Sequence, residues 1–156
     1  MHAKIYQISS ERLNADEFIT MSDLTESDMI SCYADYFDDV NENEYDDLYQ
    51  WVGEILSKAG FLREGDALIY QGAESFMQEW VDAIKAAATV LETAIMKKWM
   101  PMYRLKNVID NTHLGIDHRF YMNEECMSFG EFMRDIFADL KPGDKLYLGG
   151  IVDFHY

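Results

Sequence analysis

The chain has 156 residues, of which 49% are hydrophobic and 14% aromatic, and its formal net charge is −16. This length and apolar content suit one compact domain with a hydrophobic core. The negative charge argues against direct binding to nucleic acid or to an anionic membrane surface, because phosphates would be repelled, and it favours a basic partner.

Targeting signals are missing from the sequence. The first residues, MHAKIYQISSERL, lack the apolar run and small-residue cleavage site of a signal peptide, and no stretch of 18 apolar residues follows. Two cysteines, Cys32 and Cys126, are too few for a disulfide framework. We therefore expect a cytoplasmic protein with reduced thiols.

The first third of the chain predicts one strand and three helices. Residues 5–8 are β-rich, and Asn14 can cap a brief helix over 15–21. Apolar residues recur at helical spacing over 25–40 and again over 41–59, which predicts two amphipathic helices. Thr25 with Asp28, and Asn41 with Glu44, are spaced as capping pairs, and Gly60 can end the second helix.

The middle of the chain predicts turns, a long helix and a strand pair. The segments 63–72 and 141–150 each place a Gly-Asp turn before a β-rich run. The strongest apolar stripe predicts a helix over 74–99 that Pro101 ends. Residues 103–109 and 116–122 are predicted as strands paired around DNTHLG.

The C-terminal part completes the fold prediction. Ser128 and Glu131 form a capping pair for a helix over 129–140. The final KLYLGGIVDFHY is either one bulged strand or a hairpin about Gly149 and Gly150. Because helices and strands alternate without a βαβ rhythm, we expect a single α+β domain with a mixed or antiparallel sheet, partly covered by about four to five helices.

Acidic charge is concentrated in one segment. Between Leu13 and Ser57 there are thirteen acids and no Lys or Arg, whereas the remaining 111 residues carry 16 acids and 13 bases. Acids on the outer faces of the two expected helices are the candidate partner-binding residues. They are Asp28, Asp35, Asp38, Asp39, Glu42, Glu44, Asp46, Asp47 and Glu54.

The acidic segment suggests phosphate mimicry. Acids one helical turn apart are separated by about 6 Å, close to the roughly 7 Å between successive phosphates of a DNA strand. Anti-restriction proteins of phages and plasmids and some CRISPR inhibitors use such a surface to occupy the basic groove of a nucleic-acid-binding enzyme. We hypothesise that the protein is a non-enzymatic inhibitor of this kind. The alternative is that it is a generic acidic interaction module with a solvated face.

Two stretches partly match known functional motifs. Asp39, Asn41 and Asn43 match the first ligands of an EF-hand loop, but Glu44 stands where that loop needs Gly and Gln50 where it needs Glu. The stretch HLGID, residues 113–117, resembles the His-x-x-x-Asp motif of chloramphenicol-acetyltransferase-like and condensation enzymes, with His118 in place of the Gly that follows. That resemblance implies a general-base His113 and a structural Asp117.

The second function hypothesis follows from these residues. His113, Asp117 and His118 form a candidate site of a small enzyme or metal-binding domain. No Walker loop, dinucleotide fingerprint, Gly-x-Ser-x-Gly elbow or Cys-x-x-Cys pair is present. No specific sequence motif therefore identifies a catalytic residue, a cofactor or a metal ligand.

Overall fold

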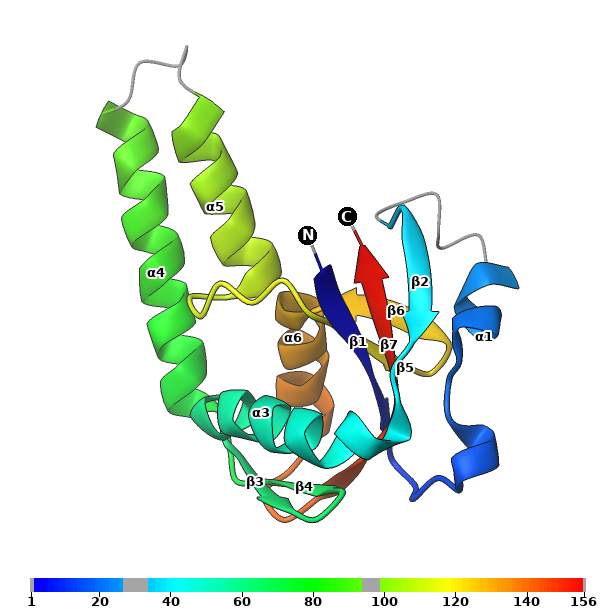
Figure 1. The fold of residues 1–156 in the computed structure, drawn as a ribbon. Helices are drawn as coiled ribbons and strands as arrows, with labels where there is room; N and C mark the ends of the chain where they lie inside the picture. Colours follow the sequence, from blue (N-terminus) through cyan, green and yellow to red (C-terminus); the bar gives the residue numbers. More distant parts are fainter. Residues whose placement is uncertain (1, 27–33, 94–98, 156) are drawn as a thin grey trace.

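The computed structural model describes residues 2–26, 34–93 and 99–155, which form one mixed sheet flanked by helices (Figure 1). Six strands run in the order β3-β4-β7-β1-β5-β6, and β2 pairs with β7. β1 and β5 are parallel, and the other paired strands are antiparallel. The strands are β1 (His2–Ser9), β2 (Tyr36–Asp39), β3 (Phe61–Glu64), β4 (Ala67–Tyr70), β5 (Arg119–Met122), β6 (Glu125–Ser128) and β7 (Lys145–His155).

Helices precede, separate and follow these strands. Short helical segments stand near the N-terminus and before the first long helix, and an αα-hairpin fills the middle of the chain. The α+β class expected from the sequence is confirmed. No helix in the described ranges combines the length and the apolarity needed to cross a membrane. The helices are η1 (Ala15–Glu17), α1 (Met21–Glu26), η2 (Glu42–Glu44), α3 (Tyr45–Lys58), α4 (Glu74–Thr93), α5 (Trp99–Asn111) and α6 (Phe129–Asp139).

The C-terminal strand β7 organises the sheet. It pairs with β1 on one side and with β4 and then β2 on the other. Its register with β1 shifts by one residue beyond Tyr6, so the C-terminal sequence forms one bulged strand and not a hairpin. At the bulge, a Cβ on Gly150 would lie 2.6 Å from the carbonyl oxygen of Ile19, and therefore only glycine fits.

The two faces of the sheet carry separate apolar clusters. Tyr6 and Phe120 lie in the larger cluster, which also holds residues of α3, α4 and α6. Ile5 and Phe154 lie in the smaller one, together with Leu24 of α1. Neighbouring residues of a strand point to opposite faces, so the apolar alternation of β1 supplies both clusters.

Several predicted element ends are confirmed. The Ser128 hydroxyl accepts a hydrogen bond from the backbone N–H of Glu131, whose carboxylate accepts one from the Ser128 N–H, so the capping box of α6 is formed. Gly60 follows α3 with φ +90°, a conformation that favours glycine. The Gly-Asp turn at 65–66 joins β3 and β4 as a hairpin.

The predicted helix over 25–40 is wrong for residues 36–39, which form strand β2. The apolar spacing that suggested a helix included Phe37, which instead packs in the smaller cluster beside Phe154 of β7. Since β4 pairs only with the first part of β7, the free edge beyond it takes β2. Residues 27–33, with Asp28, lie outside the described residues, whereas Thr25, predicted to cap a helix with Asp28, lies inside α1.

The predicted strand over 103–109 is also wrong, because these residues belong to α5. Pro101 does not end a helix but lies in the first turn of α5, where a missing N–H costs little. Leu105 and Val108 are half-buried on one face of α5, and the indole N–H of Trp80 in α4 donates a hydrogen bond to the Val108 carbonyl. Helix packing therefore overrode β propensity.

Candidate functional site

Eight of the nine candidate acids lie in the described residues, and all eight are exposed. They follow a continuous stretch of chain from the start of β2 through η2 to the third turn of α3. We call this set the acidic rim. It consists of Asp35, Asp38, Asp39, Glu42, Glu44, Asp46, Asp47 and Glu54.

Three rim carboxylates have partners within the fold. Asp35 lies 3.2 Å from the imidazole Nδ1 of His155, and Glu54 accepts a hydrogen bond from the Gln50 side chain. Asp39 accepts a hydrogen bond from the backbone N–H of Met21, the first residue of α1. Because a carboxylate stabilises a helix N-terminus, Asp39 has a structural role.

The other five rim carboxylates make no side-chain hydrogen bond or ion pair within the described residues. They belong to Asp38 on β2, to Glu42 and Glu44 of η2, and to Asp46 and Asp47 in the first turn of α3. No Lys or Arg occurs between Leu13 and Ser57 to neutralise them. These five carboxylates are therefore available to a partner.

The aromatic residues among the rim acids fix α3 to the sheet. The Tyr49 hydroxyl donates a hydrogen bond of 2.6 Å to the Gly149 carbonyl, and the Tyr45 hydroxyl accepts one of 3.2 Å from the Ile151 N–H. Both bonds reach the backbone of β7 at its bulge. Burial raises the pKa of Tyr49 above its ordinary range, so it remains a donor. These two hydrogen bonds therefore hold the rim residues of α3 against the sheet.

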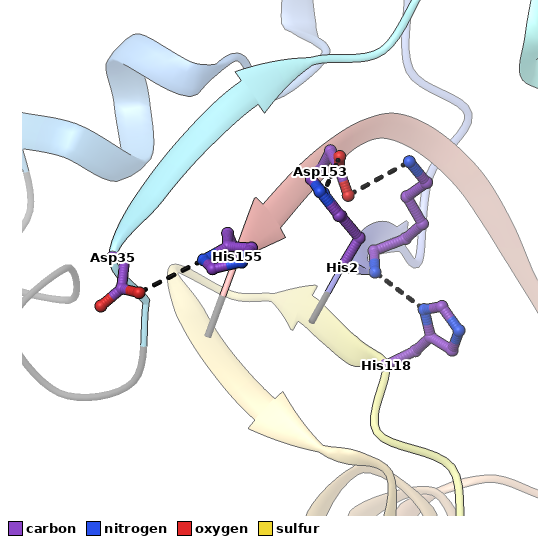
Figure 2. A network of polar contacts seen from close by, with 6 residues as sticks. His2, Asp35, His118, Asp153 and His155 are labelled. Carbon is purple, nitrogen blue, oxygen red and sulfur yellow. Dashed lines mark hydrogen bonds and ion pairs between the residues drawn. The ribbon is translucent and has the colours of Figure 1, made fainter.

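A second polar cluster lies beside the rim, where β1 and β2 begin and β7 ends (Figure 2). Asp153 contacts the His2 Nδ1 at 2.9 Å and the Lys4 Nζ at 3.2 Å. The ring of His155 stacks on Tyr36 with centroids 5.1 Å apart and meets His2 edge to face at 5.2 Å. We call these residues, with His118, the histidine cluster.

His118 is a half-buried member of this cluster. Its Nδ1 accepts a hydrogen bond of 2.8 Å from the Lys4 backbone N–H, so a neutral ring carries its proton on Nε2. Burial lowers the pKa of His118, because the imidazolium would lose solvation. His118, Asp117 and Trp51 of α3 help to line a hollow of about 380 Å³.

The three residues of the alternative site are only partly brought together. Asp117 and His118 share the hollow beside Trp51, and Asp117 accepts a hydrogen bond from Asn111. His113 instead contacts α4, with its Nε2 3.4 Å from a Glu79 carboxylate oxygen. Among residues 2–26, 34–93 and 99–155, no group of three or more His, Cys, Asp or Glu is arranged to hold a metal.

Sequence reasoning missed the histidine cluster. His2 and His155 are near opposite ends of the chain and become neighbours only because β1 and β7 pair. A signal was present, since the polar residues of HAKI and VDFH alternate with apolar ones as in half-buried strands. The pairing of those two strands could not be read from that pattern.

Comparisons with protein-family models, with curated proteins and with solved structures found no match to this chain.

Proposed function

We propose that this protein binds a basic, nucleic-acid-binding protein through the acidic rim and inhibits it by mimicking DNA or RNA phosphates, as anti-restriction and anti-CRISPR proteins do. One observation carries the proposal: five exposed carboxylates that have no partner among the described residues follow one another along β2, η2 and the start of α3. Charges left unpaired on a rigid surface are suited to Lys and Arg of a partner.

The structure changes the spacing argument made from the sequence. Asp38 and Asp39 lie on a strand, so their side chains point to opposite faces, and of the two Asp38 is the one without a partner in the described residues. Asp46 and Asp47 are neighbours in the first turn of α3, so they are not one helical turn apart. The proposal therefore rests on the continuous run of charge along β2, η2 and α3 and not on a regular phosphate repeat.

A rim-neutral variant tests the proposal. It replaces only the five carboxylates without partners and so leaves the structural contacts of Asp35 and Asp39 intact. The control variant neutralises the same number of exposed acids outside the rim. The rim-neutral variant is Asp38→Asn, Glu42→Gln, Glu44→Gln, Asp46→Asn and Asp47→Asn, and the control is Glu11→Gln, Glu64→Gln, Glu124→Gln, Glu125→Gln and Asp139→Asn.

The parent protein is first immobilised on a resin and incubated with a cell lysate. The proteins that it captures are then eluted by a salt gradient. Each captured protein is then titrated with the parent and both variants, with and without duplex DNA or RNA. We expect nucleic acid to compete, and the rim-neutral variant to bind about tenfold or more weakly than the control variant, mainly through slower association. Equal binding by both variants, or no competition, would show that the rim is only a solvated surface.

A further inference from the structure

The helix α5 carries an apolar stripe that nothing in the described residues covers. Trp99 is 65% exposed, Met102 56%, Tyr103 47% and Ile109 45%. At about 100° per residue these four side chains share one face of α5. Within this stripe Trp99 and Tyr103 contact each other edge to face, with ring centroids 5.3 Å apart.

The fold leaves this stripe facing outward. Val108 lies on the opposite face of α5 and Leu105 borders the stripe; both are half-buried, and α5 packs against α4 and α6. The α4–α5 hairpin extends beyond the rest of the molecule, on the opposite side from β2 and α1 (Figure 1). Large side chains such as Trp, Tyr and Met are enriched at protein interfaces.

The charge of α5 indicates which kind of partner the stripe can bind. Arg104 and Lys106 outnumber Asp110, whereas acids outnumber bases in every other α-helix of the described ranges. The stripe itself holds Lys106 and Asp110, which are paired at 2.7 Å, so it is close to neutral. A basic partner would be drawn to the acidic rim, and a phosphate-rich surface would be repelled by the chain as a whole.

We propose that the α5 stripe is the interface through which two copies of this chain associate about a twofold axis. Two molecules of net charge −16 repel each other least where the local charge is near zero. A stripe with one base and one acid is self-complementary, as a twofold contact requires. The rims, distant from the hairpin, stay apart and remain free for a basic partner.

Charge introduced into the stripe tests this dimer. In the stripe variant, Met102→Glu and Ile109→Glu place good helix formers at exposed positions, so α5 should still fold. The control variant Leu62→Glu and Phe137→Glu changes two exposed apolar residues elsewhere. Sedimentation equilibrium over a range of concentrations gives the molar mass of each protein, and circular dichroism melts check that all three are folded.

We expect the parent and the control variant to approach twice the chain mass with rising concentration, and the folded stripe variant to stay at the chain mass. Added salt should strengthen the dimer, because it screens repulsion between copies, whereas it should weaken binding through the rim. A monomeric parent at every concentration, or a stripe variant that still dimerises, would overturn the proposal. A monomeric parent that co-sediments with phosphatidylserine vesicles would assign the stripe to a lipid surface instead.

Discussion

Two carboxylates that oppose each other across strands β2 and β7 have different surroundings. Asp153 of β7 is 19% exposed and is held by Lys4 and His2, whereas Asp38 of β2 is exposed and its carboxylate has no partner in the described residues. Both lie at the same register of the sheet. An acid on an interior strand therefore needs an opposite charge nearby, whereas an acid on an edge strand can remain unpaired.

The comparison extends to the two clusters. In the histidine cluster, at the ends of β1 and β7, the acid Asp153 stands beside a base. In the acidic rim, five carboxylates are unpaired within the described part of the chain, and the sequence from Leu13 to Ser57 supplies no Lys or Arg. We infer that the first cluster stabilises the fold and that the rim is available for binding. Mutations that affect stability and binding separately test this division.

The largest effect is expected at Asp153. The variant Asp153→Asn leaves the three-quarters-buried Lys4 ammonium without an opposite charge and should lower the free energy of unfolding by about 2 kcal/mol. The cross-strand control Asp38→Asn should change it by less than about 0.5 kcal/mol. Urea denaturation of both variants and the parent measures the difference. Equal losses at the two positions would remove the distinction between paired and unpaired acids.

The next effect is expected at Asp39, the rim acid with a structural contact. Asp39→Ala removes the acceptor for the first N–H of α1 and should destabilise the protein by about 1 kcal/mol. Asp39→Asn keeps an oxygen acceptor and should lose less. Thermal melts of these two variants decide the matter. If alanine and asparagine are equally well tolerated, Asp39 belongs with the unpaired acids.

The pH dependence of stability should report His118. Its pKa is lowered in the folded state by burial, so the unfolded chain binds a proton more readily below its own pKa of about 6.5. Stability from the neutral ring is therefore complete above that pH and is lost as the pH falls towards the folded pKa. Urea denaturation between pH 7 and pH 5 should show this loss in the parent, and His118→Asn should flatten it. An unchanged slope in the variant would assign the pH dependence to other groups.

The smallest effect on stability is expected for the rim-neutral variant. Removing crowded like charges relieves repulsion, whereas losing Asp46 and Asp47 weakens the interaction with the N-terminus of α3. The two effects oppose each other, so the free energy of unfolding should change by less than about 1 kcal/mol. Urea denaturation beside the control variant checks this. A loss of several kcal/mol would mean that the rim is part of the structural framework.

Local sequence was enough to predict the acidic character of residues 13–57, the α+β class, the capping box of α6 and the end of α3. Each depends on neighbours within a few residues: a hydroxyl and a carboxylate three apart at Ser128 and Glu131, or a glycine at position 60 that adopts a positive φ. Short-range hydrogen bonds and apolar periodicity are written locally in the chain. They were therefore readable before any tertiary contact was known.

Three features depend on tertiary contacts: residues 36–39 form a strand, residues 103–109 form a helix, and His2 meets His155. Pairing with the free edge of β7 makes residues 36–39 a strand, and packing against α4 makes residues 103–109 a helix. The pairing of β1 with β7 brings His2 to His155. Tertiary contacts also distinguish Asp39, which contacts α1, from Asp38, whose carboxylate has no partner in the described residues. Partners far apart in sequence decide these features, because local propensities of about 1 kcal/mol or less are outweighed by burial and sheet pairing.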